Sequence, residues 1–216
     1  ALENRAVKNG VTIAQENGIP TITKMMNYHG ESNVEVARYG CGALRYLVTN
    51  DKNAVTIASE GGISAIIKMM DCHGESNVEV ARNGCCALAN LAAHVKNRVT
   101  IASEGGIPAI IQMMKRCAWS KAVARYGCSA LANLAANVQN RVIIAAFDGI
   151  LVILTMIKFH GGLEDADVVK NACCALKNLT VDNAKNKQRI CNNNGLSIIR
   201  TLKKKWLRKK QLRKKI

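Results

Sequence analysis

The sequence predicts an all-α solenoid of three-helix repeats with a concave groove. Residues 29–38 recur without change at 73–82, and the string IASEGGI occurs at both 57–63 and 101–107. Half of the chain (49%) is apolar but only 4% is aromatic, which favours closely packed helices over an aromatic-rich sandwich. The equivalent glycines are Gly18, Gly62, Gly106, Gly149 and Gly195. Successive glycines are 43–46 residues apart, which is the period of two- or three-helix repeats.

Composition excludes several other classes of protein. A mean hydropathy near zero with many branched apolar residues argues against general disorder. No apolar run approaches the ~20 residues that a membrane-spanning helix needs, and no signal-peptide pattern is present. We therefore expect no transmembrane segment and a cytoplasmic location, with the nucleus as the alternative.

The nine cysteines do not follow a metal-binding or disulfide pattern. Their number is odd, none forms a Cys-x-x-Cys motif, and no histidine stands at ligand spacing from a cysteine pair. Cysteine is then a small buried apolar residue in a reducing compartment. We expect neither a metal nor any other cofactor.

One period, residues 51–94, shows the elements expected in each repeat. A short helix over 53–60 ends on Gly61 and Gly62, and a second helix follows over 63–72, where apolar residues have helical spacing. A third helix opens on a capping box formed by Ser76 and Glu79, and runs through ARNGCCALANLAA. Ser32 and Glu35 repeat the same pattern. The abundance of Ala, Gly and Cys in the third helix predicts that its neighbours approach closely.

These motifs resemble the armadillo repeat family. The resemblance rests on the short first helix, the Gly-Ile-Pro or Gly-Ile-Ser start of the second helix at residues 18–20, 62–64 and 106–108, and GCxALxNLA in the third helix. It implies a right-handed armadillo-type α-solenoid. HEAT repeats are the alternative at the level of fold, although they usually have two helices in each unit and lack the Gly-Ile-Pro joint.

The register of the motifs divides the chain. Residues 1–8 match the end of a preceding repeat, and residues 183–202 match a partial fifth repeat. Four full repeats are expected at 9–50, 51–94, 95–138 and 139–182, followed by a basic C-terminal tail at 203–216. Because the chain opens within a third-helix motif, we expect it to be a fragment of a longer protein.

The resemblance places a row of asparagines on the concave surface, which we call the asparagine ladder (Asn90, Asn133 and Asn178). In armadillo proteins the matching asparagine binds the backbone of an extended peptide. An amide suits this role because it offers both donors and an acceptor. Tyr46 stands at this position in the first repeat. The alternative is that these asparagines brace neighbouring helices.

Eight residues before the asparagine position is a row of cations, the basic ladder (Arg38, Arg82, Arg125 and Lys170). These side chains suit acidic groups of a peptide ligand. Equally, they suit acids three residues earlier on the same helix, at Glu35, Glu79 and Asp167. Ala122 interrupts this second pattern before Arg125, so Arg125 is expected to be the freest of the four.

The chain departs from importin-α-like armadillo proteins at one position. Those proteins place Trp one turn before the asparagine, where this sequence has Gly42, Cys86, Ser129 and Cys174. A nuclear import adaptor for basic signals is therefore disfavoured. The basic ladder favours an acidic or mixed peptide segment as the partner.

Positive charge is concentrated at the C-terminal end. The chain carries a formal charge of +16, yet residues 183–216 hold thirteen basic residues and no acidic ones. Helical spacing of Ile198, Ile199 and Leu202 predicts that the last repeat helix continues into this segment. The candidate polyanion-binding residues are Lys203, Lys204, Lys205, Trp206, Arg208, Lys209, Lys210, Arg213, Lys214 and Lys215.

These features favour a non-enzymatic scaffold or adaptor that binds an extended peptide segment in the concave groove. No catalytic constellation of residues appears in the sequence. The alternative is a subunit of a larger assembly that docks on nucleic acid or another anionic surface through the basic tail. Acidic protein tails and a nuclear transport receptor are further candidate partners of that tail.

Overall fold

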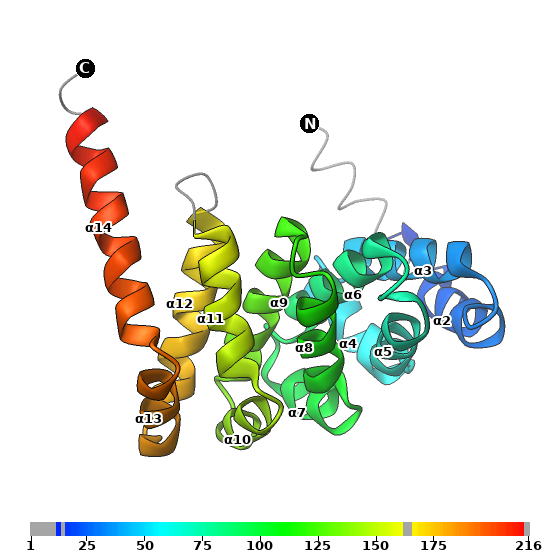
Figure 1. Ribbon diagram of the computed structural model, residues 1–216. Coiled ribbons are helices and arrows are strands. Elements are labelled where there is room, and N and C mark those ends of the chain that lie inside the picture. Colours follow the sequence, from blue (N-terminus) through cyan, green and yellow to red (C-terminus); the bar gives the residue numbers. More distant parts are fainter. Residues whose placement is uncertain (1–11, 14–15, 162–165, 214–216) are drawn as a thin grey trace.

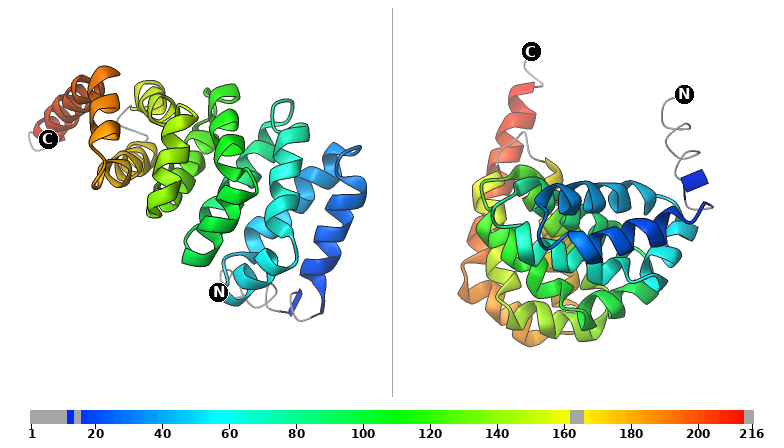
Figure 2. Two further views of the ribbon diagram at one scale, coloured as in Figure 1. Left: turned by 90° about the horizontal axis from the view of Figure 1, so that it is seen from below. Right: turned by 90° about the vertical axis from the view of Figure 1, so that its right-hand side faces the viewer.

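The computed structural model describes residues 12–13, 16–161 and 166–213, with side chains through residue 204. Helices α2 to α14 form one solenoid in which successive repeats lie side by side (Figures 1 and 2). The predicted all-α fold is confirmed. The predicted end of a preceding repeat, residues 1–8, lies outside the described residues.

A complete repeat contributes a short, a second and a third helix; the described helices begin with the second helix of the first repeat and end with the second helix of the last. The short helices are α4 (Asp51–Ser59), α7 (Val95–Ser103), α10 (Val138–Ala146) and α13 (Ala184–Asn192). The second helices are α2 (Gly18–His29), α5 (Gly62–His73), α8 (Gly106–Arg116), α11 (Gly149–His160) and α14 (Gly195–Arg213). The third helices are α3 (Val34–Leu47), α6 (Val78–Leu91), α9 (Lys121–Leu134) and α12 (Ala166–Thr180).

The anchor glycines are required by a close approach at the joint between the short and second helices. A Cβ atom on Gly62 would lie 2.8 Å from the carbonyl oxygen of Ile57 and 2.6 Å from its Cγ2. The residue before the anchor adopts a left-handed conformation, with φ of 72° at Gly61 and 63° at Asp148. The repeat period therefore reflects a steric requirement that recurs at every joint.

The capping boxes predicted at the start of the third helices are wrong. The side chains of Asn33 and Asn77, one residue after the predicted serines, accept hydrogen bonds from the backbone of α3 and α6. Ser32 and Ser76 instead donate to the carbonyl oxygens of His29 and His73. Each serine therefore holds the end of the preceding helix, while the asparagine after it caps the next.

The third helices pack directly on one another and form a continuous layer from α3 to α12. Small residues allow this approach: Cys41, Cys85 and Cys128 occupy equivalent positions and are fully buried. Glycines in the same helices receive methionines of the second helix; a Cβ on Gly127 would lie 2.5 Å from Cγ of Met114. The exposed surface of α3, α6, α9 and α12 is concave and is called here the third-helix face.

Buried asparagines fasten each short helix to the third helix before it. Asn53, Asn97, Asn140 and Asn186 donate from Nδ2 to the carbonyl oxygens of Leu47, Leu91, Leu134 and Leu179 at 2.9–3.2 Å. All four are buried. A buried amide satisfied in this way holds the last carbonyls of the third helix, which have no partner within the helix.

The basic segment continues the last helix, as the spacing of Ile198, Ile199 and Leu202 predicted. Helix α14 runs without a break from Gly195 to Arg213 and extends past the ends of α11 and α12 (Figure 1). The segment from residue 203 is thus part of a repeat helix through Arg213.

Across the described residues, no single helix is both long enough and apolar enough to cross a membrane. Only α10 and α11 taken together have that length and hydropathy, and the pair is bent by 74°.

We expect thiol reactivity to follow burial. All nine cysteines are free. Burial raises the pKa of the Cys41 thiol to about 12 and raises the pKa values of Cys85 and Cys128 further, so these three thiols stay protonated and shielded at neutral pH.

Alkylation followed by mass spectrometry should therefore modify the exposed thiols of Cys72, Cys174 and Cys191 first. In denaturant all nine should react. Reductant should leave the thermal midpoint unchanged because no disulfide is present. Rapid modification of Cys85 in the folded chain would contradict this arrangement.

Candidate functional site

The asparagine ladder lies at equivalent points of α6, α9 and α12, and two of its members already bind a neighbouring helix. Nδ2 of Asn133 donates to the carbonyl oxygen of Ala89, and Nδ2 of Asn178 to that of Ala132, both at 2.9 Å. Asn90 makes no side-chain hydrogen bond to any described residue. All three are partly exposed. Because an amide has two N–H groups and an oxygen, each asparagine retains groups for a ligand.

A second row of amides, which sequence analysis missed, lies two turns earlier. Nδ2 of Asn83 donates to the carbonyl oxygen of Arg38 at 3.3 Å, and Nδ2 of Asn171 to that of Arg125 at 3.2 Å. Asn83 is only 5% exposed, and its Oδ1 has no hydrogen-bond partner within the described chain. The spacing of seven residues from Asn90 and Asn178, which returns to the same side of a helix, was the available signal.

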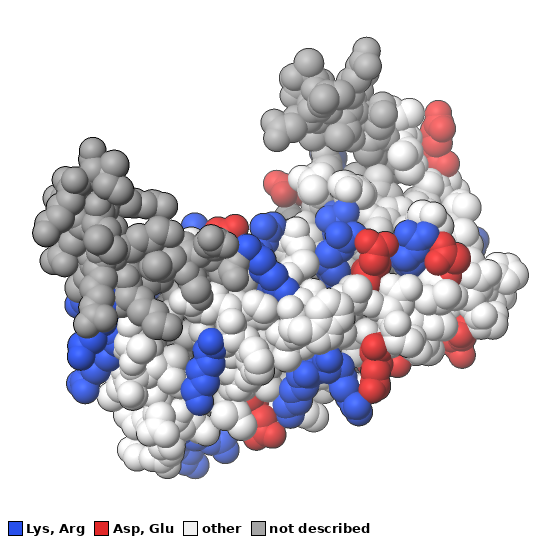
Figure 3. All heavy atoms as spheres, turned by 45° about the horizontal axis from the view of Figure 1, so that its top comes forward, with Lys and Arg blue, Asp and Glu red and all other residues white. Residues whose placement is uncertain are grey.

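The basic ladder forms ion pairs both within and between repeats. Arg38 pairs with Glu35 of its own helix and with Glu79 of α6, the latter at 3.1 Å. Arg82 pairs with Glu79 at 3.1 Å. The guanidinium of Arg38 lowers the pKa of the Glu35 carboxyl by hydrogen bonding. Figure 3 shows basic and acidic side chains alternating over this part of the surface.

The expectation that Arg125 is the freest member of this ladder is wrong. Its Nη1 lies 3.5 Å from Oδ2 of Asp167 on α12, and its Nη2 donates to the hydroxyl of Tyr126 at 2.9 Å. Asp167 therefore pairs across the repeats instead of with Lys170, three residues later. Lys170 is exposed and has no carboxylate within 4 Å among the described residues.

Arg45 is a further cation on this surface that sequence analysis missed. Its guanidinium stacks on the ring of Tyr46, 4.2 Å from the centroid, and Tyr46 is 67% exposed. No described carboxylate lies within 4 Å of Arg45, and its buried Nε has no hydrogen-bond partner there. The signal was its position, where the next two repeats have Ala89 and Ala132. Among the arginines of the third helices, Arg45 is the one without an acidic partner in the described chain.

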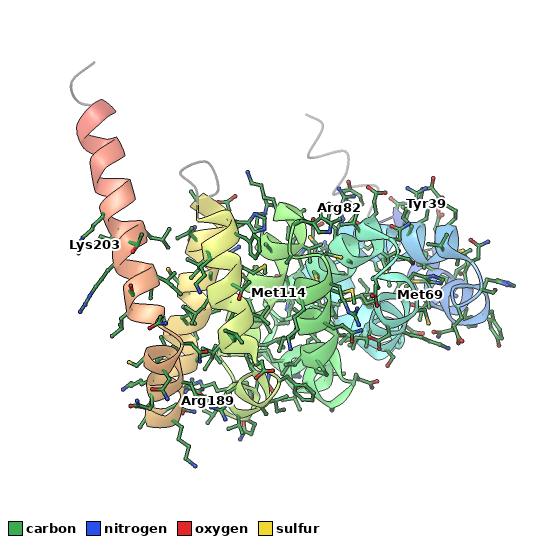
Figure 4. All side chains as sticks on the ribbon, viewed as in Figure 1. Tyr39, Met69, Arg82, Met114, Arg189 and Lys203 are labelled. Atoms are coloured by element: carbon green, nitrogen blue, oxygen red, sulfur yellow. The ribbon has the colours of Figure 1, made fainter. Side chains whose placement is uncertain are left out.

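Small residues stand one turn before the asparagine position on the four successive third helices, at Gly42, Cys86, Ser129 and Cys174. Burial raises the pKa of the Cys86 thiol, and the nearby guanidinium of Arg45 opposes that increase. Stacked pairs of Arg38 on Tyr39 and Arg125 on Tyr126 lie on the same layer of helices. Figure 4 places Tyr39 and Arg82 at one edge of the solenoid and Arg189 of α13 at the opposite edge.

The third helices together carry seven basic and three acidic residues. Since the three acids are paired with Arg38, Arg82 and Arg125, the excess positive charge includes Arg45, Lys170 and Lys177. Hydrogen-bonding amides, stacked tyrosines and excess cations suit a polar, extended ligand with negative charge. No group of three His, Cys, Asp or Glu side chains suited to a metal ion occurs among the described residues.

The candidate tail residues are described only in part. Lys203 and Lys204 are exposed on α14. The side chains of Lys205, Trp206, Arg208, Lys209, Lys210 and Arg213 lie outside the described set, although their backbone is helical. Lys214 and Lys215 lie wholly outside it. The tail therefore remains a prediction that rests on its charge.

Arg45 provides a test of ligand charge. We expect Arg45→Gln to weaken binding of the acidic octapeptide (DE)4 about tenfold, because a charged hydrogen bond contributes about 1.5–3 kcal/mol. Lys52→Gln removes the same charge from the exposed short helix α4 and is the matched control. Fluorescence anisotropy at low salt measures both. Equal affinity for both variants would exclude Arg45 from the site.

Comparison with known proteins agrees with this architecture. The model of the family described as "Protein zer-1 homolog-like, C-terminal domain" matches residues 22–216. No curated protein matches the chain in sequence.

Three solved structures are similar in fold. An engineered protein has a TM-score of 0.76 at 21% identity and aligns over 91% of this chain and 76% of its own. A designed armadillo repeat protein in complex with the peptide (KR)4 has a TM-score of 0.75 at 16% identity, over 90% of this chain and 78% of its own. A further designed armadillo repeat protein gives 0.76 at 17% identity over the same shares. At these identities the likeness concerns the fold, and it confirms the predicted armadillo-type solenoid.

Proposed function

Since this chain belongs to the zer-1 homolog-like C-terminal domain family, an armadillo-like helical domain, we propose that it is a non-enzymatic scaffold that binds an extended peptide segment along its third-helix face. The observation that carries the proposal is Asn90, a partly exposed amide with no side-chain partner among the described residues. It lies in the same row as Asn133 and Asn178, on a surface whose fold resembles a designed protein that binds a peptide.

The amide rows would hold the peptide through its backbone. Asn90 offers two N–H groups and an oxygen, which match the carbonyl and N–H of one peptide unit. Because backbone groups are common to all peptides, these contacts give affinity, and side-chain preference comes from the charged and aromatic groups beside them.

The charges support an acidic or mixed ligand. Arg45, Lys170 and Lys177 are cations of the third helices without an acidic partner among the described residues, and Tyr46 provides an exposed ring beside Arg45. The designed relative binds the basic peptide (KR)4, whereas this surface has a net positive charge. We therefore expect the acidic peptide (DE)4 to bind more tightly than (KR)4.

The test is the substitution Asn90→Ala. Since Asn90 has no intramolecular side-chain bond to lose within the described chain, the fold should be unaffected and affinity for (DE)4 should fall about three- to tenfold. The effect of Asn133→Ala is harder to interpret, because this substitution also removes the hydrogen bond to the carbonyl oxygen of Ala89. Isothermal titration measures the affinity of both variants for (DE)4, and circular dichroism measures whether each variant is still folded. Together they separate a loss of binding from a loss of stability.

The basic tail also attracts an acidic peptide, so the decisive quantity is the ratio of wild-type to Asn90→Ala affinity. The tail contributes equally to both proteins. A ratio near one would mean that the asparagine ladder only braces the helices, and would contradict the proposed binding mode.

A second function is favoured by helix α14. Nine of the thirteen residues from Lys203 to Lys215 are basic, and the helix is continuous through Arg213. A helix of this charge suits phosphate groups of a nucleic acid. Both functions are compatible on one chain because the third-helix face and α14 are separate surfaces.

A further inference from the structure

An apolar groove lies between α12 and α14, with no described helix covering it. We call it the terminal groove; its volume is about 330 Å³. It is lined by Ala166, Val169, Lys170 and Cys173 of α12 and by Ile199, Leu202 and Lys203 of α14. Its walls are apolar apart from the two lysines.

In each earlier repeat the corresponding space is filled by a third helix. Helix α9 packs on both α6 and α8, and α12 packs on both α9 and α11. In the last repeat α14 is the second helix and continues to Arg213, so the described chain contains no third helix there. The exposure of equivalent cysteines shows this difference: Cys128 of α9 is fully buried, whereas Cys173 at the same position of α12 is partly exposed.

Two of the three filled positions, those of α6 and α12, share a pattern of polar contacts. An acid in the first turn of each helix pairs with the basic ladder of the preceding repeat, as Glu79 does with Arg38 at 3.1 Å and Asp167 with Arg125 at 3.5 Å. Lys170 is the next member of that ladder. It is exposed at the edge of the terminal groove, and no described carboxylate lies within 4 Å of it.

An asparagine four residues after the acid supplies the second contact. Asn83 and Asn171 each donate to the carbonyl oxygen of the same basic residue with which the acid pairs. Helices α6 and α12 thus share an acid, an asparagine four residues later and a face of small apolar residues. Helix α9 has Ala122 and Tyr126 at the two polar positions and shares only the small apolar face. At the terminal groove the acid, asparagine and apolar face of an incoming helix would meet Lys170 and the surface of Val169 and Cys173.

The opposite wall adds a second charge. Lys203 stands where the second helices of earlier repeats carry Met70 and Met114, which are buried against glycines of the third helix. With Lys170 on one side and Lys203 on the other, the groove favours a helix that is acidic on both flanks.

We propose that the terminal groove binds an amphipathic helix of a partner protein, with small apolar residues on one face and an acid in its first turn that pairs with Lys170. This site shares Lys170 with the third-helix face, but it lies between α12 and α14 and takes a helix instead of an extended peptide. The helix continues the stacking of α3, α6, α9 and α12 by one more layer.

The probe is a helix-stabilised peptide with the sequence of residues 77–93, with both cysteines replaced by alanine. It carries Glu79, Asn83 and the small apolar face of α6. The stabilised form is used because a peptide this short is only marginally helical in water. Val169→Glu in the protein places a charge on the groove wall and should weaken peptide binding more than tenfold.

Charge exchange tests the pairing. Lys170→Glu should weaken binding about fivefold, and the peptide with Glu79→Lys should bind this variant as tightly as the original pair. Lys96→Glu, on the exposed side of α7, makes the same charge change far from the groove and should leave affinity unchanged. Circular dichroism verifies that each variant is folded.

Two results would overturn the proposal: no peptide binding by the wild-type protein, or binding that Val169→Glu leaves unchanged. Sedimentation of the protein alone adds a third. If it self-associates and Val169→Glu abolishes that association, a second copy occupies the groove instead of a partner helix.

Discussion

Replacing Gly127 by leucine should lower the free energy of unfolding by at least about 3 kcal/mol. A Cβ atom there would lie 2.5 Å from both Cγ and Sδ of Met114, and Met114 is itself fully buried. Neither group has space to move into, because α9 is enclosed by α6, α8 and α12. For a chain of this length the thermal midpoint should fall by roughly 6–12 °C.

Gly42→Ala, in the third helix α3, is a control for the loss of a helix glycine where the approach is less close. Its nearest neighbour would be Nδ2 of Asn83 at 3.3 Å, and alanine favours the helix, so stability should change by less than about 1 kcal/mol. Met114→Ala combined with Gly127→Leu should recover part of the loss by providing room. Equal effects of the two glycine substitutions would contradict close packing as the reason for the glycine.

The second large expected effect is the salt dependence of nucleic-acid binding by the basic segment. If about five phosphates are neutralised by the basic segment, log K for nucleic acid should fall with log salt at a slope of about −4 to −5. Between 50 and 200 mM salt this corresponds to roughly a 250- to 1000-fold loss of affinity. Binding of RNA, DNA and anionic vesicles at both concentrations measures it, and phosphate contact predicts little dependence on base sequence.

Truncation after Leu202 would also shorten α14, so a charge-neutral tail is the better control. Glutamine at the basic positions from Lys203 to Lys215 keeps the helix and removes nine charges. The salt dependence should then disappear, while affinity for an extended peptide on the third-helix face loses only its nonspecific part. Undiminished polyanion binding by this variant would exclude the tail as the site.

The repeat period, the three helices of each unit and the extension of α14 could be predicted because each depends on local sequence. Anchor glycines mark a steric requirement at every joint, and apolar spacing continues through Leu202. The N-caps were misplaced by one residue because serine and asparagine are adjacent and both are good caps. Which one faces the helix depends on the preceding turn.

The charged surface was harder to predict because its pairs join different repeats. Arg38 with Glu79 and Arg125 with Asp167 are each separated by about one period, so spacing within a helix suggested the wrong partners. Arg45 was missed because the other repeats have alanine or lysine at its position. The hydrogen bonds of Asn133 and Asn178 to neighbouring helices also depend on the stacking distance, which the sequence alone does not specify.

The most direct test of peptide binding on the third-helix face is site-specific photocrosslinking. A benzophenone side chain is placed at Ser129, which is partly exposed between Tyr126 and Asn133 in α9, or at Gln112, on the exposed side of α8. After illumination with labelled (DE)4, the proposal predicts a crosslink from position 129 and none from position 112. A crosslink from position 112 alone, or from neither position under conditions where the peptide is bound, would contradict it.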